Sequence, residues 1–104
     1  MRGMKPWRQK VIAFDYDETI SLNRILFKRV MELFRECNWC VIICTWRDID
    51  ELGDLHDLKI EGYEIFATNR QAKREFMKNK GYEVDVWVDD FPEAIIMSLE
   101  ELNK

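Results

Sequence analysis

Residues 11–19, VIAFDYDET, join an apolar run to a cluster of acids, and this junction decides the fold that the sequence predicts. The apolar, β-branched residues at 10–14 are typical of a short strand in the interior of a protein. The chain then turns acidic at once, with Asp15 and Asp17 separated by one residue. A buried strand that ends in carboxylates indicates a site at the carboxyl end of a parallel strand.

Three further apolar runs predict strands at about residues 39–44, 63–67 and 84–88. Apolar residues at helical spacing predict helices between them, at about residues 25–34, 48–58 and 70–80, and a last helix from residue 92. Alternating strands and helices predict an α/β fold of one domain over residues 1–104. We expect a three-layer, Rossmann-like open parallel sheet of about four strands, in the order 3-2-1-4, with helices on both faces.

Composition limits the class of protein further. The chain has 104 residues, 47% of them hydrophobic, with only 4 Gly and 2 Pro, which is typical of a compact globular domain. A net charge of -4 gives no general reason to expect nucleic-acid binding, although it does not exclude a local basic patch. No apolar run is long enough to span a bilayer, and residues 1–7 lack the apolar core of a signal peptide. We therefore expect a cytoplasmic protein with no membrane partner.

The three cysteines are an odd number, which argues against a closed disulfide framework. Cys37 and Cys40 form a CxxC pair, but the pair follows a predicted helix, whereas redox pairs gain reactivity at a helix N-terminus. A zinc site would need two more ligands, and His56 is the only histidine. We expect Cys40 and Cys44 to share one face of a buried strand.

Every predicted strand is followed by polar residues at the same edge of the sheet. The first strand leads into Asp15 and Asp17, the second into Thr45 and Arg47, the third into Lys73, and the fourth into Asp89 and Asp90. Clustered acids need a positive charge among them, and Mg²⁺ prefers sites made of oxygen ligands. The sequence therefore predicts a magnesium site at this edge, with Asp89, and Asp90 as a further candidate, opposite the first strand.

These residue types suit phosphoryl transfer. Asp15 could attack phosphorus and form an aspartyl-phosphate, and Asp17 could donate a proton to the leaving oxygen and then accept one from water. Thr45 and Lys73 could bind the phosphoryl oxygens, and Arg47 could form a bidentate contact with a substrate phosphate. Lys73 is preferred over the other lysines of its helix because it lies in the first turn, close to the active edge.

The order of these residues resembles the four motifs of the haloacid dehalogenase-like superfamily. The segment 11–19 resembles the first motif, DxDxT; residues 42–45 resemble the second, Lys73 the third, and residues 86–90 the fourth. The resemblance implies a small magnesium-dependent phosphatase without a cap domain, with Asp15 as nucleophile and Asp17 as acid and base. It also implies metal ligands from Asp15, the backbone carbonyl of Asp17, and Asp89.

Two details of the motifs bear on the substrate. Glu18 stands where many members of the superfamily carry Gly, and the resulting DxDET resembles phosphatases of the polymerase C-terminal domain. The run from Thr45 to Arg47 is similar to small bacterial and phage-type members and to polynucleotide 3′-phosphatase domains. We expect a phosphorylated substrate that is a small molecule, a nucleotide or a nucleic-acid end. Trp46 could stack on a base or simply pack at the strand end.

Two alternatives involve no turnover. A receiver-like phosphoacceptor domain also uses carboxylates, Mg²⁺, Thr and Lys at strand ends, but its acid pair follows the first strand and its acceptor a later one. A partner-binding domain that lacks catalysis is the other alternative, and the complete set of catalytic residue types argues against it. The sequence leaves a homo-oligomer open.

Overall fold

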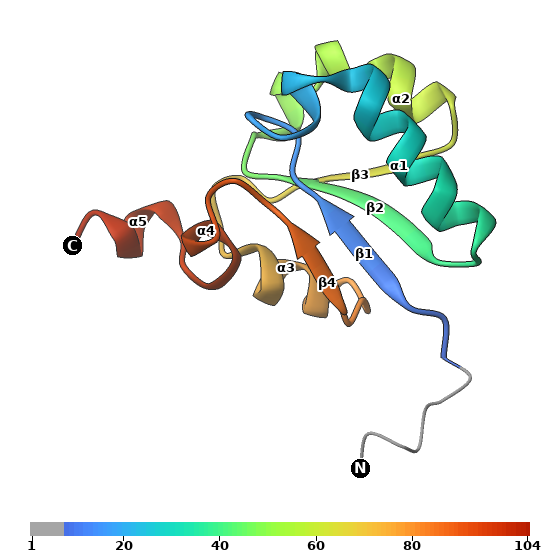
Figure 1. Ribbon diagram of the computed structural model, residues 1–104. Coiled ribbons are helices and arrows are strands. Elements are labelled where there is room, and N and C mark those ends of the chain that lie inside the picture. Colours follow the sequence, from blue (N-terminus) through green and yellow to red (C-terminus); the bar gives the residue numbers. More distant parts are fainter. Residues whose placement is uncertain (1–7) are drawn as a thin grey trace.

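Four parallel strands form the centre of the computed structural model, which describes residues 8–104 (Figure 1). The expectation about a signal peptide concerns residues 1–7 and lies outside the described residues. The strands are β1 (Val11–Phe14), β2 (Cys40–Thr45), β3 (Glu64–Ala67) and β4 (Val86–Val88). Their order, β3-β2-β1-β4, confirms the predicted Rossmann-like order 3-2-1-4.

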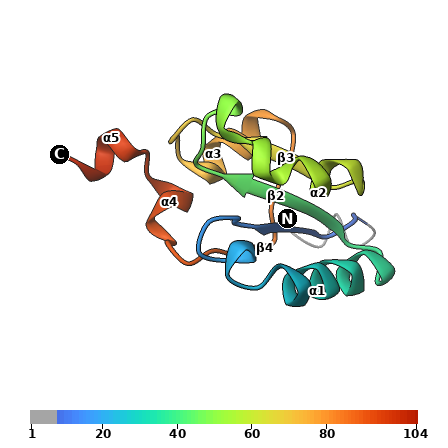
Figure 2. The same ribbon diagram turned by 90° about the horizontal axis from the view of Figure 1, so that it is seen from above.

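Helices cover both faces of this sheet, as the sequence predicts (Figure 2). The helices α1 (Arg24–Glu36) and α2 (His56–Ile60) pack on one face, and α3 (Lys73–Asn79) packs on the other. The alternation of side chains along β1 separates the two cores: Ile12 and Phe14 belong to the first, Val11 and Ala13 to the second. β1 is therefore buried on both faces, which explains its continuous apolar sequence.

Phe14 anchors the first of the two cores. Its ring makes edge-to-face contacts with Phe27 and Phe34 of α1, with centroids 6.3 and 6.2 Å apart. Replacing such a fully buried aromatic residue by Ala typically costs about 3–5 kcal/mol. In the second core, Cys44 is buried and Cys40 packs against the same cluster, which confirms that they share one face of β2.

The predicted helix over residues 48–58 is not continuous. Two 3₁₀ turns, η3 (Ile49–Glu51) and η4 (Gly53–Leu55), precede the five-residue α2. Asp48 and Glu51 form a capping box that supports only the first turn, and Gly53 follows at once. Leu55 and Leu58 are buried as the spacing predicts, whereas Ile49 is 74% exposed.

The last predicted helix is also divided, into α4 (Glu93–Ile96) and α5 (Leu99–Leu102). Met97 is extended, and Ser98 starts the second helix by accepting a hydrogen bond from the backbone N–H of Glu101, 3.1 Å away. Ser98 and Glu101 form a capping box, which favours a new helix start at this point.

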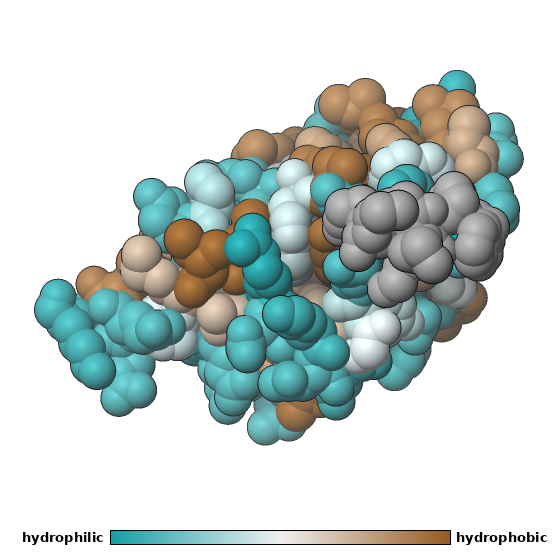
Figure 3. All heavy atoms as spheres, turned by 90° about the horizontal axis from the view of Figure 1, so that it is seen from below, coloured by the Kyte–Doolittle hydropathy of each residue, from teal (hydrophilic) through white to brown (hydrophobic). Residues whose placement is uncertain are grey.

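The connections between strands add no further domain. One 3₁₀ turn, η2 (Ile20–Leu22), and α1 connect β1 to β2, and η3, η4 and α2 connect β2 to β3. Within residues 8–104, no domain is inserted between these strands, in agreement with the expected fold. Over residues 8–104, no helix combines the length and the apolar composition that crossing a bilayer requires. Seen from below, the surface is largely hydrophilic, with separate hydrophobic patches (Figure 3).

Candidate functional site

The register of the sheet brings the ends of β1 and β4 together. Phe14 is paired with Val88, and the backbone N–H of Asp15 donates to the carbonyl of Val88 at 2.8 Å. Asp15 and Asp89 are therefore the first residues after two neighbouring parallel strands. Asp89 is held further because its Oδ1 accepts a hydrogen bond from the backbone N–H of Phe91, at 2.9 Å.

Lys73 lies between these two aspartates. Its ammonium donates to Asp15 Oδ1 at 2.9 Å and to Asp89 Oδ2 at 2.5 Å, and its side chain is only 2% exposed. A buried ammonium is costly unless anions surround it, so the two contacts account for its burial.

The start of α3 explains this placement. Asn69 and Arg70 have positive φ angles of 55° and 61°, which turn the chain after β3 and delay the helix to Lys73. The predicted helix start at about residue 70 is thus three residues early. Lys78, farther along α3, and Lys80, which follows its last residue, are exposed, as expected for lysines far from the edge.

Three carboxylates form a compact group at the same point. Asp15, Asp89 and Asp90 each offer an oxygen, and these oxygens lie within 4.8 Å of one another. The Thr19 hydroxyl is 3.3 Å from Asp15 Oδ2 and 3.4 Å from Asp90 Oδ1, so it can donate to either. With one lysine against three carboxylates, the group has a formal excess of two negative charges. A divalent cation that prefers oxygen ligands would balance it, so these residues fit Mg²⁺.

The pKa values express the same imbalance. Burial raises the pKa of Asp15 to about 7; the charge of Lys73 opposes this, and contacts with Asp90 and Asp89 add to it. Burial by itself would lower the pKa of Lys73, but Asp15 and Asp89 outweigh it and raise that pKa above its ordinary value. The lysine is therefore charged, and a proton competes for Asp15 near neutral pH. A bound cation would favour the ionised carboxylate.

Asp17 and Arg47 are brought together by the fold, but in an arrangement that the sequence did not predict. Arg47 Nε and Nη2 donate to the two carboxylate oxygens of Asp17 at 2.9 and 2.6 Å. The same guanidinium also contacts Asp54 and donates to the carbonyl of Glu51 at 2.7 Å, and it lies 5.2 Å from the centre of the Tyr16 ring.

This arrangement occupies the donors of Arg47 and both oxygens of Asp17. The predicted contact of Arg47 with a substrate phosphate, and the predicted proton transfer by Asp17, both require this ion pair to open. The carboxylate of Asp17 also lies outside the group of three that fits a metal, so its predicted metal contact remains the one through the backbone carbonyl.

A pocket of about 320 Å³ opens over the carboxylates, and its walls include Asp17, Lys73 and Trp46. Trp46 packs edge-to-face against Phe91, with ring centroids 5.8 Å apart. Thr45 is fully buried, accepts the backbone N–H of Arg47 at 3.3 Å, and is not among the residues that line the pocket. Its predicted contact with a phosphoryl oxygen stays a prediction.

Sequence reasoning missed the roles of two residues. Thr19 belongs to the DxDxT pattern, and its spacing of four from Asp15 was a usable signal for a contact between them. Phe91 lines the pocket next to Trp46, and no periodicity or motif pointed to it. Glu18, the residue that departs from Gly in the resembling family, has a φ of 59°, a conformation that Gly adopts with less strain.

Comparisons of the chain with models of protein families, with curated proteins and with solved structures found no match.

Proposed function

We propose that this protein is a Mg²⁺-dependent phosphomonoesterase of the haloacid dehalogenase-like type, with Asp15 as the nucleophile. One observation carries the proposal: Lys73 is buried between Asp15 and Asp89, at the point where three carboxylates meet. A fold keeps such an unbalanced group of charges at a cost in stability, and sites with strongly perturbed groups are often functional.

The first chemical step transfers the phosphoryl group to the protein. A carboxylate oxygen of Asp15 attacks phosphorus, and the bond from phosphorus to the leaving oxygen breaks. Asp17, once released from Arg47, takes up a proton from solvent and gives it to that oxygen, so an alcohol leaves. Lys73 stabilises the charge on the phosphoryl oxygens through a hydrogen bond. The hydroxyl of Thr45 is buried and does not line the pocket, so it would have to become accessible to do the same.

The second step returns the protein to its starting state. Water attacks the phosphorus of the aspartyl-phosphate, Asp17 accepts a proton from that water, and the acyl–phosphate bond breaks to release inorganic phosphate. Asp15, Asp89, Asp90 and the backbone carbonyl of Asp17 are the proposed ligands of Mg²⁺, which supplies positive charge for the phosphoryl group.

The test is phosphate release in the presence of Mg²⁺ from p-nitrophenyl phosphate, nucleotides and a 3′-phosphorylated oligonucleotide. We expect Asp15→Asn to abolish turnover, by about 10³-fold or more, because an amide oxygen is a poor nucleophile. Asp50→Asn is the matched control: Asp50 is exposed in η3, outside the site, and should keep full activity.

Asp17→Asn separates the roles of the two aspartates. An acid is needed most where the leaving oxygen is basic, so the loss should be larger for an alkyl phosphate than for p-nitrophenyl phosphate. Activity retained by Asp15→Asn would refute the nucleophile. No turnover of any substrate by the wild type, together with stable labelling of Asp15, would favour a receiver-like phosphoacceptor.

A further inference from the structure

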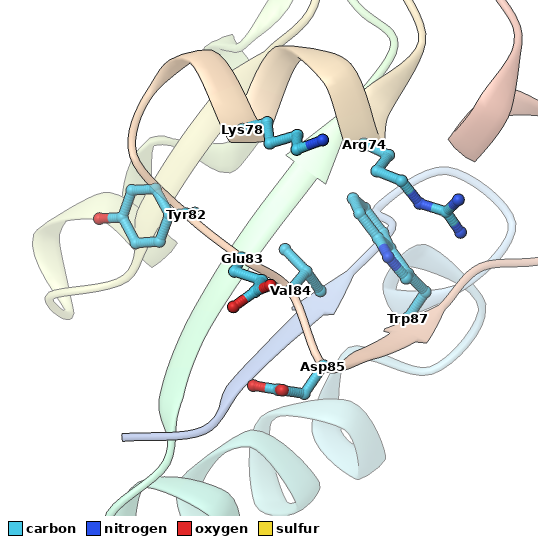
Figure 4. Close-up of a pocket in the computed structure, with 7 residues that line it drawn as sticks. All are labelled: Arg74, Lys78, Tyr82, Glu83, Val84, Asp85 and Trp87. Carbon is cyan, nitrogen blue, oxygen red and sulfur yellow. The ribbon is translucent and has the colours of Figure 1, made fainter. Parts of the chain in front are cut away.

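A groove lies between α3 and the edge strand β4, on the face of the sheet opposite α1 (Figure 4). Its volume is about 410 Å³. Met77 packs α3 onto residues of β1 and β2, so the same face of β4, at the edge of the sheet, is left partly open.

The charged residues of this groove are not equivalent. Arg74 and Lys78 lie one turn apart on α3, and both are exposed. Within residues 8–104, neither side chain forms an ion pair or a hydrogen bond. The acids of the groove, Glu83 and Asp85, lie near Arg8: Asp85 is 2.5 Å from its guanidinium and Glu83 is 3.8 Å from it. Arg8 thus offsets one of the two negative charges, and with Arg74 and Lys78 the groove has a formal net charge of about +1. The two cations of α3 are available to a ligand.

An aromatic side chain completes the groove. Trp87 on β4 stands beside Arg74 in Figure 4 and is half-buried. Aromatic side chains next to unpaired cations are the usual elements of a surface that binds single-stranded nucleic acid, because bases stack and phosphates pair with the cations. An acidic peptide would use the cations and leave the indole without a role.

The groove and the candidate site contain residues that are neighbours in the sequence. Arg74 directly follows Lys73, and Trp87 of β4 lies two residues before Asp89. A polynucleotide whose terminal phosphate lies over Asp15 could place its next nucleotides along this groove. The two sites share no lining residue, and α4, whose Ala94 lines the carboxylate pocket, packs against α3. A bound polynucleotide would therefore have to pass α4 on its way from Asp15 to the groove.

We propose that the α3–β4 groove binds a single-stranded polynucleotide whose terminal phosphate lies at Asp15. Arg74 and Lys78 contact the backbone phosphates, and Trp87 stacks on a base. Only the placement of the terminal phosphate at Asp15 rests on the proposed phosphatase function. The binding of the strand is a property of the groove and can be measured separately.

The test compares two double variants of equal charge change. Arg74→Glu/Lys78→Glu reverses the two positive charges of the groove. Arg29→Glu/Lys59→Glu reverses the charges of two exposed cations on α1 and α2. Binding is measured by fluorescence anisotropy in the Asp15→Asn background, with labelled single-stranded 12-mers that carry a 3′- or a 5′-phosphate. Turnover of the 12-mers and of p-nitrophenyl phosphate is measured in the wild-type background.

We expect the groove variant to weaken binding on the order of tenfold, and the control variant to leave it within about twofold. Two lost phosphate contacts should lower the slope of log affinity against log salt by about 1.4. The KM for the 12-mers should rise, whereas turnover of p-nitrophenyl phosphate should not change. Comparison of the two 12-mers decides which end is the substrate.

Trp87 is tested by a pair of substitutions because it also packs against the core. Trp87→Phe keeps an aromatic face and should retain most of the affinity, whereas Trp87→Leu should lose on the order of tenfold. Equal affinity in both would refute stacking, and competition by a polyglutamate peptide as strong as by the 12-mer would show a groove selective for charge alone.

The two proposals fail in different ways. Groove-dependent binding of the 12-mer without turnover of any substrate would refute the phosphatase and leave the groove. Turnover with identical 12-mer binding in both double variants would refute the groove and leave the phosphatase.

Discussion

Two charged clusters share the carboxyl edge of the sheet, and they differ in burial. The inner cluster consists of Asp15, Lys73, Asp89 and Asp90; the side chains of Lys73 and Asp89 are each 2% exposed, and only Asp90 is exposed to solvent. The outer cluster consists of Asp17, Arg47 and Asp54, and its two acids are 51% and 54% exposed. Water screens the outer cluster, whereas the charges of the inner cluster interact strongly.

The difference indicates what each cluster contributes. The inner cluster carries more negative than positive charge, so it could hold a cation, as the proposed function requires. The outer cluster is satisfied by its own hydrogen bonds and holds Asp17 and Arg47 in one arrangement. Three substitutions test this comparison, in order of decreasing expected effect on stability.

The largest effect is expected for Lys73→Met. Removing the ammonium leaves Asp15 and Asp89 buried without their cation, which should lower the free energy of unfolding by about 3 kcal/mol at pH 8. Urea denaturation without Mg²⁺ measures it, and Lys78→Met on the exposed side of α3 is the control. A variant as stable as the control would contradict the view that Lys73 compensates the acids.

An intermediate effect, of opposite sign, is expected for Asp15→Asn. Because the fold raises the pKa of Asp15 from 3.8 to about 7, its protonated form stabilises the fold fully below pH 4, and this contribution is lost as the pH rises through 7. At pH 8 without Mg²⁺, the amide should raise the free energy of unfolding by on the order of 1–3 kcal/mol.

Thermal unfolding of the wild type and Asp15→Asn between pH 4 and pH 8 measures this effect. The gain should shrink at low pH, and Mg²⁺ should stabilise the wild type more than the variant. Parallel pH profiles for the two proteins would show that Asp15 does not titrate in this range.

The smallest effect is expected for Asp54→Asn in the outer cluster. Exposed ion pairs contribute little, so the free energy of unfolding should change by less than about 1 kcal/mol. Arg47 would lose one anchor and release Asp17 more readily, which should show in turnover rather than in stability. A loss of stability as large as that of Lys73→Met would remove the distinction between the clusters.

The sequence was sufficient for the sheet but not for all the helices. The four strands and their order were predicted because each strand is a short apolar run with a polar end. The helix over residues 48–58 was predicted as continuous because Leu52, Leu55 and Leu58 keep helical spacing across 3₁₀ turns as well. The break at Met97 had a signal, the capping box of Ser98 and Glu101, which was outweighed by the apolar spacing.

The sequence by itself determined which residues meet at the edge, because strand ends in a parallel sheet share one edge and the residues after them are fixed by the chain. Only the tertiary structure decided how these residues pair: Lys73 with two aspartates, Arg47 with Asp17, and Arg74 and Lys78 beside Trp87 with no charged partner in the described chain. The reason is physical. Apolar periodicity reflects neighbours along the chain, whereas the partner of a charged side chain depends on distances between elements that are far apart in sequence.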